Sequence, residues 1–245
     1  MPLTEHLREL RQRLIKSVVA FLVASGAAFY LAQYIFEVLK EPVQRAYPQV
    51  QLITLSPTEP LFILIKISVV FGFILSSPVI LYQLWKFVEP ALYPQEKKLV
   101  IPITLFSIML FLLGASFAYF LVMPIALKFL LGIGFSQLQA TPYLSVNLYV
   151  SFLLKMIVGF GLAFQLPIIL YLLQRAGIVS EQQLKAFRKY FIVLAFVVGA
   201  FIAPDATTQV LMAIPLILLY EISLILGKLG RRKKETSIEP VKENV

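Results

Sequence analysis

The chain has 245 residues, of which 59% are hydrophobic and only 14% are charged, whereas soluble domains contain about 25% charged residues. It contains no cysteine, which excludes disulfide bonds, thiolate metal ligands and cysteine nucleophiles. The net charge of +9 does not indicate nucleic-acid binding, because the basic residues flank long apolar blocks, as in membrane proteins.

The apolar blocks are long enough to cross a bilayer, whose hydrocarbon core of about 30 Å requires about 20 helical residues. We predict an all-α integral membrane domain over residues 1–230 and a disordered basic cytoplasmic tail over 231–245. The third predicted span exceeds one perpendicular crossing and must tilt or extend into water. The last two spans are short. The six predicted spans are 14–39, 61–85, 99–131, 148–173, 191–203 and 210–226.

Two acids outside the spans have alternative interpretations. Glu9 lies in an amphipathic segment ahead of the first span and is spaced i, i+4 from Arg13, which suits an exposed intrahelical ion pair. Glu96 follows Pro94 after the second span and suits the start of a helix, where the dipole favours an acid. The residues alone do not decide between these structural roles and a binding role.

The distribution of Lys and Arg predicts the topology. Most of the 22 basic residues lie at the N-terminus, after the second span, after the fourth span and in the C-terminal tail. Basic segments remain in the cytoplasm, so both termini are expected inside. That parity requires six crossings and favours a fifth span over a re-entrant hairpin.

Polar residues at membrane depth are costly and face protein or water. Lys155 and Glu221 either extend toward opposite interfaces, which we favour, or form a buried pair. Gln165 and Gln209 are suited to bonding neighbouring helices. Asp205 is suited to capping the sixth helix.

Catalytic motifs do not occur. The single histidine, His6, precedes the first span, so no HExxH zinc motif exists, and neither a P-loop nor a GxGxxG motif is present. A Gly-Ala-Ser-Phe segment at 114–117 has no general base to accompany it. We therefore expect no enzyme activity, no metal and no cofactor, and a role in binding or transport.

Several stretches resemble one family of membrane proteins. They match in order over about residues 4–228, and together they are specific although each alone is weak. The stretches are His6-Leu7 to Arg13-Leu14, residues 77–83, 89–93 and 117–120, and Phe196-Val197-Val198-Gly199 running to Pro204-Asp205. The sequence resembles the TatC subunit of the twin-arginine translocase, in the Sec-independent translocase family.

The resemblance implies a function. TatC-like proteins bind the paired arginines in signal peptides of folded proteins at the cytoplasmic face. They then nucleate a translocation complex, driven by the proton gradient, with TatA-like and TatB-like single-span proteins. The resemblance also implies self-association, contact with membrane lipid, and a multi-pass location in a bacterial or archaeal plasma membrane with both termini inside.

Four residues match family positions for signal-peptide recognition. Glu9 and Glu96 match its acidic positions, and a carboxylate can bind an arginine guanidinium through two hydrogen bonds. Lysine offers a point charge without this planar fork, so such a site prefers arginine. Leu14 and Phe87 match apolar positions next to the arginines.

Other residues match family positions linked to the membrane cavity or to partner docking. They are Pro42, Pro48, Tyr119, Gln165, Asp205 and Gln209. Gln165 departs from the family pattern, because many members have Glu there. An amide forms hydrogen bonds but carries no charge, so a mechanism that requires an ionised carboxylate at this position is in doubt for this chain.

The short fifth and sixth spans, about 20 and 25 Å long at 1.5 Å per residue, suggest local bilayer thinning beside the receptor. Two other function classes stay open at this stage. One is a small-solute secondary transporter in which Lys155, Gln165 and Glu221 line a midplane site. The other is a non-transporting membrane scaffold.

Overall fold

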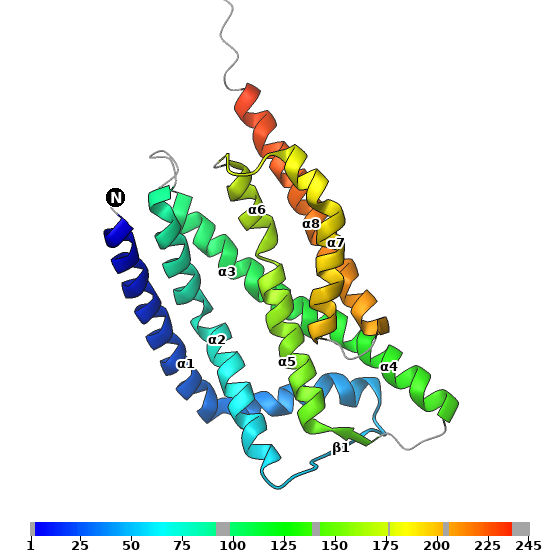
Figure 1. Cartoon of the computed structure of the whole chain (residues 1–245). Helices are drawn as coiled ribbons and strands as arrows, with labels where there is room; N and C mark the ends of the chain where they lie inside the picture. The colour runs from blue at the N-terminus through cyan, green and yellow to red at the C-terminus, as the bar shows by residue number, and fades with distance from the viewer. Residues whose placement is uncertain (1–2, 92–98, 139–142, 176, 203–205, 237–245) are drawn as a thin grey trace, which may run out of the picture.

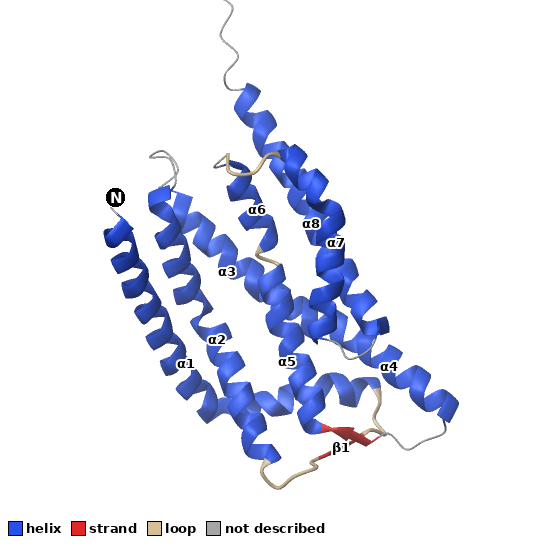
Figure 2. Cartoon of the chain, viewed as in Figure 1, coloured by secondary structure: helices blue, strands red, loops and turns tan. Residues whose placement is uncertain are grey.

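The computed structural model describes residues 3–91, 99–138, 143–175, 177–202 and 206–236. Its elements are almost all helical (Figure 2). The helices are α1 (Leu3–Ala46), α2 (Glu59–Val88), η1 (Glu89–Ala91), α3 (Val100–Phe117), the π-helix η3 (Ala118–Val122), α4 (Met123–Leu138), α5 (Val146–Ala163), α6 (Leu166–Arg175), α7 (Glu181–Ile202) and α8 (Ala206–Thr236). Two three-residue strands, β1 (Gln51–Ile53) and β2 (Tyr143–Ser145), pair in parallel and were not predicted.

The bundle has two ends (Figure 1). The start of α1 and the far end of α8 lie together at one end, which we call the N-terminal side. The strands and the start of α5 lie at the other end, which we call the strand side. The described chain therefore begins and ends on the same side of the bundle, as an even number of crossings produces.

The predicted spans correspond to these helices with some differences. Five of the described helical stretches are long and apolar enough to cross a membrane. The fifth predicted span forms the apolar end of α7, whose first turns are charged (Glu181, Lys185, Arg188 and Lys189). The fourth span is divided into α5 and α6 at Phe164–Gln165. α8 includes residues 231–236, the start of the stretch for which we predict disorder, and residues 237–245 lie outside the described residues.

The third predicted span runs diagonally, which is one of the two arrangements that its length allows. α3, η3 and α4 follow one another and cross the bundle diagonally (Figure 1). In η3 the N–H of Met123 bonds to Ala118 O, five residues earlier. This wider turn lies directly ahead of Pro124, whose ring would otherwise clash with the preceding turn.

α1 bends, and its last part runs across the strand side of the bundle (Figure 1). Pro42 lies inside this part and has no N–H to donate to Val38 O, four residues earlier. The Tyr119 hydroxyl donates to Val38 O at 2.7 Å, and the Tyr149 hydroxyl donates to Leu39 O at 2.6 Å. Tyrosines from η3 and α5 therefore satisfy backbone carbonyls beside the proline and hold α1 across the bundle.

We expect Tyr149→Phe to lower the free energy of unfolding by about 1.5 kcal/mol, because it removes a buried hydrogen bond to the Leu39 carbonyl. Tyr119→Phe should cost less, about 1 kcal/mol, because this bond is more exposed and water can replace the hydroxyl. Unfolding in mixed micelles measures both. Tyr34→Phe is the control, since the Tyr34 ring is 74% exposed. Equal losses in all three variants would contradict the assigned role of the two hydroxyls.

Three buried clusters hold the helices together. The largest joins α1, α2, η3, α4 and α5 around Met123, Val150 and Leu153. A second joins α7 to α8, where the rings of Phe191 and Tyr220 stack with centroids 4.2 Å apart. The third surrounds Trp85 and Phe111 and joins the C-terminal half of α2 to α3 and α6. The first turns of α1 lie outside these clusters, and the end of α2 beside them carries polar residues next to Trp85.

Candidate functional site

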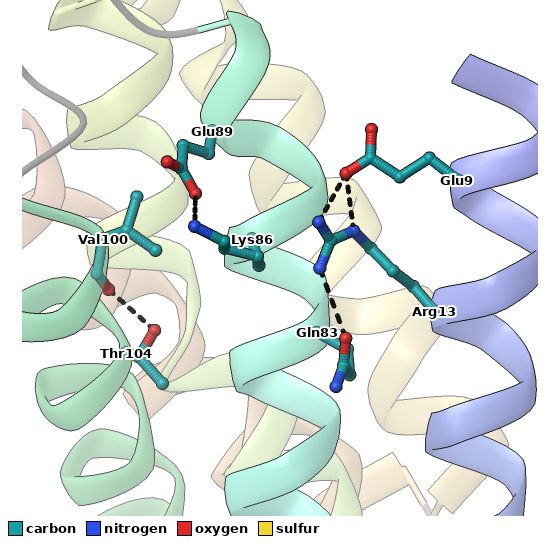
Figure 3. A network of polar contacts seen from close by, with 7 residues as sticks. All are labelled: Glu9, Arg13, Gln83, Lys86, Glu89, Val100 and Thr104. Carbon is teal, nitrogen blue, oxygen red and sulfur yellow. Dashed lines mark hydrogen bonds and ion pairs between the residues drawn. The ribbon is translucent and has the colours of Figure 1, made fainter. Parts of the chain in front are cut away.

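An arginine on α1 joins the predicted acid Glu9 to α2 on the N-terminal side (Figure 3). Arg13 Nε donates to Glu9 Oε1 at 2.9 Å, and Arg13 Nη2 contacts the same oxygen. Arg13 Nη1 donates to Gln83 Oε1 at 3.3 Å. The Glu9 side chain is 24% exposed, and its Oε2 contacts no donor among the described residues. A second cationic group can therefore reach this carboxylate from solvent.

The apolar members of the predicted site lie beside this network. Phe87 of α2 stacks on His6 of α1, with ring centroids 4.5 Å apart and planes inclined by 23°. Leu14 is 60% exposed and continues an exposed apolar stripe with Leu7 and Leu10. The structure thus brings Glu9 and Phe87 to the same pair of helix ends. Glu96 lies outside the described residues.

A further acid lies at this end of α2. Lys86 Nζ pairs with Glu89 Oε2 at 2.5 Å, and in Figure 3 this pair faces Val100 and Thr104 at the start of α3, away from Glu9. Thr104 donates to Val100 O within α3. Of these two acids, Glu9 is the one that lies between α1 and α2, whereas Glu89 faces α3.

Gln165 lies in a buried polar network at the break between α5 and α6. Its Nε2 donates to Ser107 O at 3.0 Å, and Trp85 Nε1 donates to Ser107 Oγ at 2.8 Å. Gln165 is only 5% exposed, and its Oε1 has no hydrogen-bond partner within the described part of the chain. The network joins α2, α3 and the α5–α6 break, so Gln165 bonds a neighbouring helix as its sequence position suggested.

Gln209 also bonds a neighbouring helix. Its Nε2 donates to Phe196 O at 2.6 Å and thereby ties α8 to α7. The two helices approach closely at Gly199, where an added Cβ would lie 3.0 Å from Gln209 O. Asp205, the third polar residue predicted in this region, lies outside the described residues.

Two of the predicted docking residues meet on the strand side. Pro42 and Tyr119 line one cavity of about 300 Å³ between the last part of α1 and the η3–α4 segment. Its charged lining residues are Glu41, Arg45 and Lys128. Pro48 lies in the turn after α1, is exposed, and does not line this cavity.

Glu221 and Lys155 do not pair with each other. Glu221 forms a two-point ion pair with Arg188 of α7, with Nε–Oε1 at 2.7 Å and Nη2–Oε2 at 2.8 Å. Lys155 is exposed and forms no hydrogen bond or ion pair with any described residue. The alternative of a buried Lys155–Glu221 pair was therefore wrong. The proposed transporter site is not assembled either, because Gln165 contacts Ser107 instead of these two residues.

Glu59, which the sequence interpretation did not single out, organises the strand side. Its Oε2 accepts N–H groups from Leu55 at 2.5 Å and Ser56 at 3.3 Å. Its Oε1 accepts the Asn147 N–H at 3.0 Å and the Ser145 hydroxyl at 3.3 Å. A signal was present, because Ser56 and Glu59 have the spacing of a capping box at the start of an apolar helix.

Known proteins resemble this chain over nearly its whole length. The sequence profile of the family described as Sec-independent protein translocase protein (TatC) matches residues 5–215. The chain belongs to the TatC family. A curated TatC of Aquifex aeolicus is 69% identical over 235 residues, which cover 96% of this chain and 98% of that protein. A TatC of Desulforapulum autotrophicum is 41% identical over 245 residues, covering 99% and 90%.

Solved TatC structures have the same fold. A crystal structure of the twin-arginine translocase receptor TatC superposes with a TM-score of 0.88 at 67% identity, covering 93% of this chain and 100% of the other. A second, in the detergent DDM, gives 0.86 at 68% identity, covering 91% and 99%. The predictions of a six-helix membrane fold and of TatC membership are confirmed. The chain is therefore a multi-pass membrane subunit of the Tat translocase and not an enzyme, consistent with a bacterial plasma membrane.

Proposed function

We propose that the N-terminal side of this chain lies in the cytoplasm and binds the paired arginines of signal peptides. The observation that carries the proposal is the arginine site at Glu9. Arg13 lies there with its guanidinium between Glu9 Oε1 and Gln83 Oε1. Side chains of α1 and α2 are thus already arranged to hold one guanidinium.

The free oxygen of Glu9 supports binding of an incoming arginine. Glu9 Oε2 contacts no described donor, so a peptide arginine can bond to it directly or displace Arg13 from Oε1. Glu96 is the proposed acid for the second arginine. The half-buried ring of Phe87 and the exposed side chain of Leu14 would provide apolar contacts for residues next to the arginines.

Partner docking is proposed for the cavity residues Pro42 and Tyr119, together with Pro48, Gln165, Asp205 and Gln209. TatA-like and TatB-like single-span proteins would dock there, and copies of this chain would associate in the proton-gradient-driven complex. The charge bias supports the orientation, because the basic ends of α1, α6 and α8 all lie on the N-terminal side.

The decisive experiment compares a peptide carrying paired arginines with the same peptide carrying paired lysines. We expect the arginine peptide to bind the full-length protein in nanodiscs at least about tenfold more tightly, because lysine lacks the two-point fork. Equal affinities would contradict the receptor proposal. Uptake of a small solute by vesicles containing this chain alone would support the transporter alternative instead.

A further inference from the structure

A line of polar residues follows the exposed face of α5 into the membrane from the strand side. Asn147, Ser151 and Lys155 are spaced by four residues and share one face of α5. Lys66 of α2 donates from Nζ to Asn147 Oδ1 at 2.5 Å and to Ser151 Oγ at 3.0 Å. We call these four residues the α5 polar stripe. Both lysines are exposed, and Asn147 and Ser151 are partly exposed.

The stripe extends from the membrane surface inward. Asn147 is the second residue of α5, so the ammonium group of Lys66 lies level with the strand-side end of this helix. Lys155 lies eight residues further along α5, about 12 Å at 1.5 Å per residue. One turn beyond Lys155, an added Cβ on Gly159 would lie 2.8 Å from Ile202 at the end of α7. The stripe therefore lies on the face of α5 between α2 and α7.

No acid of the described chain neutralises these two lysines. The strand-side acids are already engaged. Glu37 pairs with Lys40, Glu41 pairs with Arg45, and Glu59 accepts hydrogen bonds from the backbone. Among the described residues, Lys66 is bound only by the neutral groups of Asn147 and Ser151. A lysine at membrane depth is costly unless it reaches the interface or finds an anion, and no described residue supplies that anion.

We propose that the α5 polar stripe binds the phosphate of an anionic phospholipid in the leaflet on the strand side. Lys66 lies at the level of the headgroups, and basic pockets between membrane helices bind such headgroups. A phosphate has several acceptor oxygens. One oxygen can accept a hydrogen bond from the third N–H of Lys66, which Asn147 and Ser151 leave available. Another oxygen can accept a hydrogen bond from Lys155. Because Lys155 lies deeper, this contact draws the headgroup inward and thins the leaflet beside α7. The proposal is independent of the signal-peptide site.

The test is native mass spectrometry of the full-length protein in detergent, titrated with phosphatidylglycerol or phosphatidylcholine. We expect tighter binding of phosphatidylglycerol, and we expect Lys66→Gln with Lys155→Gln to weaken it about tenfold or more without changing phosphatidylcholine binding. Lys155→Arg should retain the preference because it keeps the charge. Lys128→Gln is the matched control, since it removes one exposed strand-side lysine outside the stripe.

Each outcome decides the proposal. Unchanged phosphatidylglycerol binding in the double glutamine variant would overturn it and would assign the lysines to another anion, such as a carboxylate of a second membrane helix. Competition with inorganic phosphate separates the two sources of phosphate. If phosphatidylglycerol stays bound in the presence of inorganic phosphate, the α5 polar stripe is a lipid site. If inorganic phosphate displaces phosphatidylglycerol, the stripe binds a soluble anion, and this result also overturns the proposal. The single variant Lys155→Gln serves as a check on folding. The Lys155 side chain is exposed and has no polar partner among the described residues, so its replacement should leave the fold intact.

Discussion

Glu9→Gln is expected to weaken binding of a twin-arginine peptide by about 10- to 100-fold, because a charge-assisted hydrogen bond is replaced by a neutral one. The change preserves the size of the side chain, and Arg13 can still bond to the amide oxygen and to Gln83. Fluorescence titration of a labelled peptide against the protein in nanodiscs measures the affinity.

The control is Glu181→Gln, which removes a carboxylate on the same side of the membrane at the start of α7, where Glu181 pairs with Lys185. It should leave peptide affinity unchanged. If Glu9→Ala combined with Glu96→Ala leaves crosslinking of the twin-arginine peptide intact, the proposed site is wrong. Loss of affinity for paired-arginine and paired-lysine peptides to the same degree would show a general charge effect instead of arginine recognition.

Glu59→Ala is expected to lower the melting temperature by about 5–10 °C, because it removes the acceptor for three backbone N–H groups at once. Those groups belong to the loop before α2 and to the first turn of α5. Glu59→Gln should rescue little of the loss, because its amide nitrogen would face another donor on one side. Thermal unfolding of the purified protein in detergent measures both effects.

Glu37→Gln is the corresponding control, because the Glu37 side chain is 63% exposed and pairs only with Lys40. A melting temperature as low as that of Glu59→Ala would show that any strand-side acid has this effect. Signal-peptide affinity should survive Glu59→Ala below its melting temperature, since Glu59 and Glu9 lie at opposite ends of the bundle.

The sequence predicts the membrane helices well because their signal is local. Apolar length alone located the blocks, and the excess length of the third block predicted either a tilt or an extension into water, of which the structure shows a diagonal course. The break at Phe164–Gln165 was missed, because the apolar composition continues through it and the residues there are stabilised by Ser107 of another helix. The β1–β2 pair was also missed, since three-residue strands carry no usable periodicity.

In the candidate site, too, the local contacts were predictable from the sequence and the tertiary contacts were not. The i, i+4 spacing of Glu9 and Arg13 correctly indicated their ion pair. The bond from Arg13 to Gln83 was not predictable, because it depends on how α1 packs against α2 and joins residues 70 positions apart. Glu59 was overlooked for the same reason, because two of its partners, Ser145 and Asn147, come from a distant segment. Tertiary partners of polar residues are what a single sequence does not specify.

Under the proposed function, a peptide arginine that takes the place of Arg13 at Glu9 would make recognition an exchange. Before any peptide arrives, Glu9 already holds a guanidinium that belongs to the chain itself. A peptide with a single arginine that displaces Arg13 forms one ion pair at the expense of another, with little net gain. In that case a second arginine, bound elsewhere on the N-terminal side, adds the interaction that the empty receptor lacks. An internal competitor of this kind would set a threshold of two arginines for productive binding.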